Sequence, residues 1–543
     1  MTFFVALDYV VLGAVLCISA GIGIYYRFSG GKQKTNQEYL LGGRSQGIVP
    51  VAFSIMASFM SAITLLGTSA EIYSHGFIFV TINFTYIAAI PIITNFYMPV
   101  FFNLGYVSVY EYLEKRFGTA TRLACSLVFI LQGVLYMGVV LYAPALALEA
   151  VSGMSQSSAI LIVGFVCVFY STIGGIKAVI MTDVFQSLLM YAALFCVIGV
   201  SLVNAHGISD IWKFVFYFIG GVFIFISLFG VNQIQVQRYL TTKNLGAASR
   251  SLWLALPLLS FLEVSACLCG LCLLYKYHDC DPIRTGRVKS NDQLMPLFVL
   301  DTMGRYPGLP GLFVAGMFSA ALSTISGAIN SLAAVTLEDY IRPLHSYLTS
   351  DTMEHRKSVL LSKILALAYG CVCIGIAFLS KYLGSVLQAA FTIFGVVGGP
   401  LLAVFTLGVL APLCNEKVRL LQVSTVLWSC ISAWLGFGGP KPAVPNLPTT
   451  LDGCSHQQQL YFNGTINFKS EEDSTEFSYL YRISYMYYVL LGFLTTFLVG
   501  IIVSCFTKRN NKLNPALYSP CLFKYMQKKY EAQLRLVKGL NEY

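Results

Sequence analysis

The feature that most constrains this chain is a series of apolar runs, each long enough to cross a lipid bilayer. Leu188 to Val203 and Tyr488 to Val503 are two of them, and they are apolar nearly all round. A soluble amphipathic helix has one apolar stripe, whereas a helix that is apolar on every side is typical of a membrane span. The mean hydropathy of +0.70 and the charged fraction of 11% fit the second class. We therefore predict an all-α polytopic membrane protein.

The apolar runs predict about thirteen membrane-spanning helices, each near the roughly 20 residues that one crossing requires. The last run ends near residue 506, so we expect a transmembrane domain over 1–506 and a cytosolic basic tail over 507–543. The first run starts close to Met1 without a basic leader, and no cleavable signal peptide is expected. The expected limits of the spans are 6–26, 49–75, 78–103, 124–150, 157–175, 183–205, 214–236, 251–275, 308–337, 358–380, 384–412, 420–438 and 480–506.

The distribution of Lys and Arg between the runs predicts the orientation of the chain. Loops on one side carry many basic residues, including Arg27, Arg44 and Arg238, whereas the short loops on the other side offer little beyond Lys213 and Lys381. Because basic loops stay in the cytosol, the N-terminus is predicted outside. An odd number of spans then places the C-terminus inside.

Two longer segments, 276–307 and 439–479, fall on the predicted outer face. The second contains the sequon Asn463-Gly464-Thr465, so Asn463 is a candidate for glycosylation. Cys280 and Cys454 lie on the same face and are candidates for a disulfide, although two free thiols are also compatible with the sequence.

The composition argues against several classes of function. The net charge of +10 arises from loops and the tail, as membrane topology requires. We therefore expect the lipid bilayer, and not a nucleic acid, as a partner. The histidines are scattered and no CxxC pair or HExxH motif occurs, so metal catalysis has no support. A membrane-embedded enzyme would need a catalytic constellation such as paired intramembrane aspartates, and we expect no catalytic residues.

One apolar run, Phe318 to Ala334, contains an unusual row of hydroxyl residues. Ser319, Ser323, Ser326 and Asn330 follow a 4-3-4 spacing and form one polar stripe on a helix. Ser323 and Thr324 are three and four residues after Ala320, so their hydroxyls can converge with the Ala320 carbonyl. Three neutral oxygens at membrane depth suit a small hard cation. Close helix packing through small residues is the alternative explanation.

A second run, Phe53 to Gly76, is also rich in small and hydroxyl residues. Such a segment can unwind locally and expose carbonyl groups to a cavity. Broken helices of this kind hold ions and substrates in transporters, so this run favours the ion-site interpretation of the first one.

Five stretches of this chain resemble the sodium/solute symporter family, in the branch of sodium-coupled monocarboxylate, multivitamin and iodide transporters. They are ASFMSAITLLGTSAEIY, STIGGIKAVIMTDVFQ, VNQIQVQRYL, CDPIRTGRVKSNDQLMP and GLPGLFVAGMFSAALSTISGAINSLAAVTLEDYIRP. The resemblance covers nearly the whole chain in order. It implies a LeuT-type fold with two inverted five-helix repeats, preceded by one helix and followed by two.

The resemblance also implies a sodium site, with sodium as the co-transported ion. Carried over residue by residue, the ligands are the carbonyls of Ala57, Met60 and Ala320 and the hydroxyls of Ser323 and Thr324. Asp183 falls where the family has an acidic residue that supports sodium binding, and Gln186 lies one turn later. For Asp183, capping of a helix N-terminus is an equal alternative.

Other candidates follow from position alone. Thr64, Asn83, Tyr142 and Asn232 are candidates for a substrate pocket. Glu263 is a lone charge inside an apolar run, either protonated and bonded to a neighbour such as Ser260 or lining the pathway.

The expected function is sodium-driven import of a small organic anion, first a monocarboxylate, across the plasma membrane. Vitamin carboxylates (biotin or pantothenate) and iodide are the second and third substrates, and a non-transporting solute sensor is the alternative class. No Lys or Arg is expected deep inside a span, so hydroxyls, backbone N–H groups and half-helix dipoles would bind the anion. The outer connection AHGISDIWK, at 205–213, is shorter than in relatives and leaves transport competence open.

Overall fold

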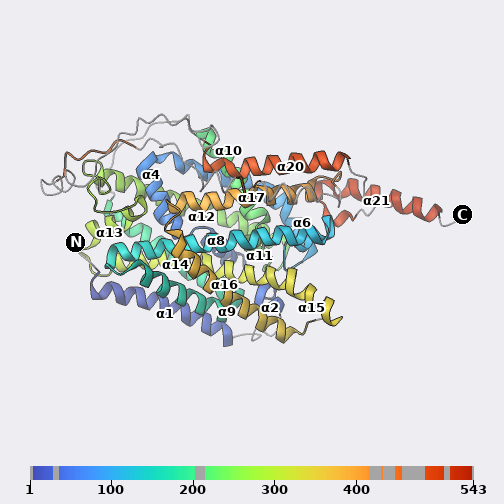
Figure 1. Cartoon of the computed structure of the whole chain (residues 1–543), viewed down its shortest axis with the longest axis horizontal. Coiled ribbons are helices and arrows are strands. Elements are labelled where there is room, and N and C mark those ends of the chain that lie inside the picture. Colours follow the sequence, from blue (N-terminus) through green and yellow to red (C-terminus); the bar gives the residue numbers. More distant parts are fainter. Residues whose placement is uncertain are drawn as a thin grey trace.

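A computed structural model of the chain describes residues 4–28, 36–201, 214–351, 353–414, 428, 430–431, 447–454, 483–506 and 514–540. Within these ranges the chain forms helices and connecting turns, and the single bridge of β geometry joins Gln46 to Thr242. Figure 1 shows long helices that run roughly alongside one another, with α1 at one end of the chain and α21 projecting from the other. The predicted all-α class is confirmed.

Ten helical stretches in the described part are long and apolar enough to cross a membrane, and two bent helix pairs raise the number to as many as twelve. Eleven of these twelve stretches agree closely with the predicted limits. The predicted span at 420–438 lies almost entirely outside the described residues. The helices that contribute single crossings are α1 (Ala6–Phe28), α5 with α6 (Ile82–Ile92 and Met98–Leu104), α8 (Thr119–Ser152), α12 (Leu245–Tyr277), α14 (Leu309–Thr336), α16 (His355–Ser380), α17 (Val386–Leu410) and α20 (Tyr488–Phe506).

The stretch Gly175–Gly199 corrects one predicted boundary. The sequence suggested separate spans at 157–175 and 183–205, but α9 runs from Gln156 to Ser201 and turns at Gly175, where φ is 65°. A Cβ at this position would lie 2.8 Å from the Tyr39 ring, so the turn requires glycine on two grounds. The second crossing therefore begins at Gly175 and places Asp183 inside a helix. The alternative role of Asp183 as an N-terminal cap is wrong.

Two spans are broken in the middle. The helix α3 (Ile48–Phe59) is followed by a π-helical turn, η2 (Thr64–Thr68), and by α4 (Ser69–His75), and the two halves are bent by 60°. The pair formed by α10 (Phe214–Phe225) with η5 (Ile226–Val231) and α11 (Gln233–Tyr239) is bent by 57°. The first break lies in the run that the sequence predicted to unwind.

The helix α14, which carries the hydroxyl row, is the most enclosed span. In its most apolar window 94% of the residues are buried within the protein, against 28% for α1, α16 and α20. The outer three helices can expose leucine-rich faces to lipid, whereas α14 packs on α1, α3, α8, α9 and α16. Its alanine, serine and glycine residues suit this central place because small side chains allow close approach of neighbouring helices.

Short helices cover the ends of the bundle. The two that matter below are η6 (Asn291–Gln293) and α13 (Leu294–Met303), which precede α14. The tail also contacts the bundle: the Ser519 amide donates to the Val409 carbonyl (3.1 Å) and Tyr112 donates to the Leu517 carbonyl (3.1 Å). Other short helices include α2 (Asn36–Leu41), η3 (Phe77–Thr81), α7 (Glu111–Phe117), η7 (Leu337–Ile341) and α15 (Arg342–Thr349), and the longer helix α21 (Pro520–Leu540) forms the tail.

Candidate functional site

The break in the first bent span meets the hydroxyl row of α14. Met60 ends α3 with extended backbone angles (φ −74°, ψ 99°), so its carbonyl departs from the helical direction. The Thr324 hydroxyl donates to the carbonyl of Ala57 (3.3 Å) and to that of Ala320 (3.1 Å). The Thr324 hydroxyl thus lies within hydrogen-bond distance of two other predicted ligand oxygens, and Met60 follows Ala57 in the same break.

Asp183 connects this cluster to a third helix. Its carboxylate accepts hydrogen bonds from the hydroxyls of Ser323 on α14 and of Ser54 on α3, the latter at 2.5 Å. The side chain is fully buried. Since the Ser323 proton points to Asp183, the lone pairs of the same oxygen stay free to face a cation. The four predicted residues Ala57, Ala320, Ser323 and Thr324 thus share one small region with Asp183.

Gln186 does not join the same group. Its amide nitrogen approaches the Ser19 hydroxyl of α1 at 3.4 Å, and its amide oxygen is buried without a hydrogen-bond partner in the described residues. The structure thus brings Asp183 to the ion-site candidates but directs Gln186 toward α1.

Arg238 is the residue whose position differs most clearly from our prediction. We predicted a cytosolic loop charge, but the side chain is fully buried in α11. Its guanidinium donates to the Ser54 hydroxyl (2.9 Å) and lies 3.3 Å from the Asp183 carboxylate. A Cβ added to Gly327 of α14 would lie 2.2 Å from this guanidinium, so only glycine leaves room for it. Arg238 is the second-last residue of α11, so it lies at the end of its bent span but inside the protein.

Other polar side chains of α11 also form hydrogen bonds inside the protein. The Gln235 amide donates to the Ser58 hydroxyl (3.0 Å), and the Gln237 amide donates to the Leu40 carbonyl (2.7 Å). The signal for this buried network was the stretch VNQIQVQRYL itself, where polar residues occupy successive turns of a predicted span. We read its arginine from topology and missed its role in the core.

The four candidates for substrate binding come from four elements, and the hydrogen bonds of the described residues join none of them to another. Asn232 caps α11 by accepting from the Ile234 amide (3.0 Å), and Asn83 donates locally to the Val80 carbonyl (2.7 Å). Thr64 in η2 and Tyr142 in α8 are each 9% exposed. Of the four, these two hydroxyls are therefore the better candidates for donors to an anion.

Glu263 has a partner that the sequence did not indicate. Its carboxylate accepts a hydrogen bond from the Thr68 hydroxyl (3.1 Å) on the second half of the first broken span, the half predicted to face outside. We expected Ser260, which is on the same helix as Glu263 and is not the recorded partner. The side chain is 4% exposed.

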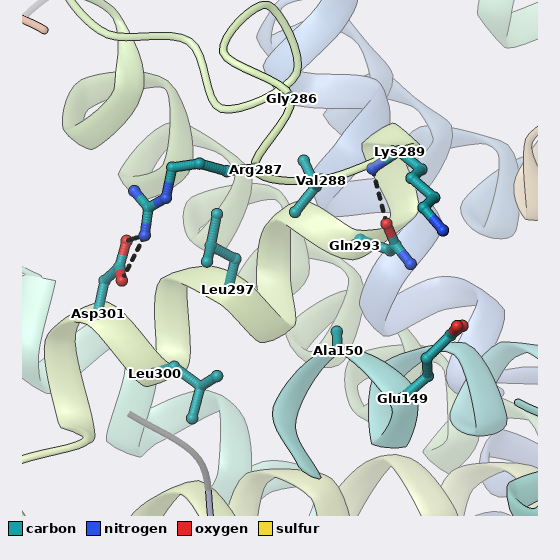
Figure 2. Close-up of a pocket in the computed structure, with 10 residues that line it drawn as sticks. All are labelled: Glu149, Ala150, Gly286, Arg287, Val288, Lys289, Gln293, Leu297, Leu300 and Asp301. Atoms are coloured by element: carbon teal, nitrogen blue, oxygen red, sulfur yellow. Dashed lines mark hydrogen bonds and ion pairs between the residues drawn. The ribbon is translucent and has the colours of Figure 1, made fainter. Parts of the chain in front are cut away.

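A separate cavity of about 180 Å³ lies at the predicted outer end of the bundle, between α8, α13 and the loop that carries Gly286. Figure 2 shows the Arg287 guanidinium paired with Asp301, and the Lys289 ammonium projecting on the side where the Glu149 carboxylate also lies. Two cationic and two anionic residues thus line this cavity. None of the predicted site residues is among its lining residues.

Cys280 and Cys454 form a disulfide, which joins the two predicted outer segments. Beside it, the Arg284 guanidinium donates to the Thr449 carbonyl (2.6 Å) and the Thr449 hydroxyl donates to Asp281 (2.8 Å). Asn463 and the short connection at 205–213 lie outside the described residues.

Comparison with known proteins agrees with this architecture. The profile of the "Sodium:solute symporter family" matches residues 39–216 and 202–421, and the overlap of the two matches includes the short connection at 205–213. A Drosophila melanogaster protein, provisionally named a sodium-dependent multivitamin transporter, is 50% identical over 92% of this chain and 86% of its own length. The human sodium-coupled monocarboxylate transporter 1 is 43% identical over 94% of this chain and 89% of its own.

Among solved structures, a sodium-coupled sialic acid symporter in a substrate-bound, outward-open state superposes with a TM-score of 0.74. It covers 93% of this chain and 99% of the symporter chain at 22% identity. This likeness concerns the fold. Together with the family profile and the two relatives, it identifies the chain as a member of the sodium:solute symporter family, a group of sodium-coupled transporters and not of enzymes.

Proposed function

We propose that this protein imports a small organic anion, first a monocarboxylate, by coupling its movement to sodium. The observation that carries the proposal is the cluster of Ala57, Ala320, Ser323 and Thr324 around the break in α3, with Asp183 behind it. Ser323 and Thr324 would bind sodium through their hydroxyl oxygens, and the carbonyls of Ala57, Met60 and Ala320 would complete the shell. The buried Asp183 would orient Ser323 through its hydrogen bond.

The electrical driving force follows from charge. Each net positive charge that moves inward through 100 mV gains about 2.3 kcal/mol. Import of one monoanion with more than one sodium is therefore electrogenic and strongly driven. Asp183 and Arg238 neutralise each other across 3.3 Å, so this pair adds no net charge to the interior of the bundle.

The LeuT-type arrangement fits the two bent spans, because each repeat of that fold begins with one broken helix. The likeness to the sialic acid symporter supports this assignment. We further propose a thirteenth span near 420–438, an outer N-terminus, a cytosolic tail over 507–543 and residence in the plasma membrane. Glycosidase treatment should increase the gel mobility of the wild type but not of Asn463→Gln, and equal behaviour of the two would contradict the orientation.

The vitamin carboxylates biotin and pantothenate are the second candidate substrates, favoured by the 50% identity to the Drosophila protein. The decisive experiment is uptake of labelled lactate, nicotinate, biotin, pantothenate and iodide into expressing cells, with and without sodium. We expect sodium-dependent lactate or nicotinate uptake. Sodium-dependent uptake of biotin or pantothenate alone would move the substrate to the vitamin class, and uptake of iodide alone would move it to the third candidate. Surface expression without any uptake would favour the solute-sensor alternative.

A further inference from the structure

Asp183 and Glu263 are two carboxyl groups buried well inside the described spans, and they differ in how their charge is compensated. Asp183 is fully buried, and the Arg238 guanidinium lies 3.3 Å from it. Glu263 is 4% exposed, and none of the ion pairs in the described part of the chain includes it. One carboxyl therefore has a permanent cation, and the other one lacks it.

The surroundings of Glu263 on α12 are neutral. The recorded hydrogen bond is the one from Thr68 at 3.1 Å. The titratable side chains that interact with Glu263 are Tyr86 of α5 and Cys267 of α12 itself. A phenol and a thiol carry no positive charge, so neither can balance a carboxylate.

Several charged or titratable groups on the other elements packed against α12 have partners of their own. In α4, Glu71 lies 3.4 Å from His75, and both are farther along the half-helix than Thr68. The sequence of α3 contains no titratable residue, and the same holds for η2 and η3. Other groups are Tyr191 of α9, which donates to the Leu258 carbonyl, Arg238 of α11, which pairs with Asp183, and Asp301 of α13, which pairs with Arg287. Tyr73 of α4 and Tyr239 of α11 are phenols and carry no positive charge, and Lys177 of α9 lies beside Gly42, ahead of α3.

A bare carboxylate at membrane depth costs at least a few kcal/mol, so a mobile cation has to balance it. Sodium would require several more oxygen ligands than the one Thr68 hydroxyl. The hydroxyls of Ser69 and Ser265 hydrogen-bond to the Leu65 carbonyl (2.9 Å) and the Phe261 carbonyl (2.7 Å), and neither of them is bonded to Glu263. A proton needs no such shell, since it bonds directly to the carboxylate oxygen.

We propose that Glu263 is a proton-binding site coupled to the position of the outer half-helix formed by η2 and α4. The carboxyl holds a proton while this half-helix packs on α12, and it releases the proton to external water when the half-helix moves away. In this structure the half-helix also packs tightly on α17, where a Cβ on Gly67 would lie 2.7 Å from Leu387, and we take this packed position as the closed one. The inference rests on the proposed transport cycle, in which the half-helix has to open to the outside.

The coupling predicts a pH dependence of a definite sign. Protons stabilise the closed half-helix, so external acidification should raise the external sodium concentration that gives half-maximal uptake. One linked proton changes this concentration by up to about tenfold per pH unit. The test is sodium-dependent uptake into proteoliposomes of the full-length wild type and of Glu263→Gln, between about pH 6 and about pH 8.

Glu263→Gln imitates the protonated form and still accepts from Thr68. We expect its half-saturating sodium concentration to stay high and to vary less than about twofold over the same range. Glu149→Gln, which removes a carboxyl in the outer cavity, should keep the wild-type pH dependence. A pH dependence in Glu263→Gln equal to that of the wild type would overturn the proposal. The proposal would also fail if Glu263→Gln moved one sodium ion fewer per substrate than the wild type, because Glu263 would then be part of a sodium site.

Infrared difference spectroscopy of the purified protein tests the proton without transport. We expect a protonated-carboxyl band at neutral pH that disappears in Glu263→Gln and shifts in Thr68→Val, which removes the hydrogen bond but keeps the carboxyl. If Glu263→Gln fails to fold, the shift in Thr68→Val still decides the matter, and its absence overturns the proposal. If the band behaves as expected but no substrate of the panel is taken up, the proposed function fails and the proton site stands.

Discussion

Replacement of Ser323 by alanine separates an ion ligand from a packing residue. The side chain is fully buried, and its hydroxyl donates to Asp183. Alanine preserves the helix and the close approach of neighbouring helices, so it deletes one oxygen and little else. Asp183 keeps the Ser54 hydroxyl (2.5 Å) and Arg238 (3.3 Å), and we expect surface expression close to that of the wild type.

The size of the effect follows from the kind of interaction that is lost. A hydrogen bond to a charged group contributes about 1.5–3 kcal/mol. If this contribution is made in the sodium-bound state, its loss raises the half-saturating sodium concentration by about 10- to 100-fold, at 1.4 kcal/mol per tenfold change. Thr324→Ala loses neutral hydrogen bonds to two carbonyls, each worth about 1 kcal/mol, and should raise the concentration by about fivefold or more.

Ser319→Ala is the matched control. Ser319 lies one turn before Ser323 on the same helix, is equally buried, and has a hydroxyl without a hydrogen-bond partner in the described residues. Removal of an unsatisfied polar atom should be neutral or slightly stabilising. We therefore expect sodium activation within about twofold of the wild type.

The assay is sodium-dependent uptake of whichever panel substrate the wild type transports, normalised to surface protein. The packing interpretation predicts that all three alanine variants behave alike. Unchanged sodium activation in both Ser323→Ala and Thr324→Ala, at normal surface expression, would refute the assignment of the ion site even though the fold is right.

Three further predictions concern folding. Arg238→Gln leaves Asp183 as an uncompensated buried charge, which costs about 3–5 kcal/mol; surface biotinylation should show a loss that adding Asp183→Asn largely restores, and no recovery would contradict the pairing. Cys280→Ser and Cys454→Ser should lower the thermal midpoint equally and non-additively, and an impermeant maleimide should label neither cysteine in the unreduced wild type. Burial raises the pKa of Asp292 from 3.8 to about 6, so its charging in the folded protein opposes folding; stability should fall by up to about 3 kcal/mol as pH rises from about 4 to about 6, and Asp292→Asn should abolish this part of the slope in a thermal melt.

Much of the fold was predictable because long apolar runs have few alternatives in a membrane. Hydrophobic length placed eleven of the crossings, and hydroxyl content indicated the break near Met60. The start of the next crossing at Gly175, which we predicted at residue 183, was missed for a physical reason. A single residue at φ 65° redirects the chain without a polar loop, so the polar-looking stretch before Asp183 continued as helix.

The candidate site was predictable only where its residues share one helix. The spacing of Ala320, Ser323 and Thr324 is a local property of α14, and the structure keeps it. The contact of Arg238 with Asp183 joins residues 55 positions apart, and that of Thr68 with Glu263 joins residues 195 positions apart. No periodicity encodes such pairs, since they depend on how the helices pack. The family profile and relatives therefore contributed more to function than residue spacing did.

The bridge between Cys280 and Cys454 makes a covalent ring of everything between them, since the two cysteines are 174 positions apart. The ring contains α13, α14, α16 and α17, hence the helix that carries Ser323 and Thr324. A protease that cuts once inside the ring leaves two pieces that still migrate together until a reductant is added. One cut outside it releases a fragment at once. Comparison of reduced and unreduced gels after brief digestion from either side of the membrane thus reports which exposed loops belong to the ring.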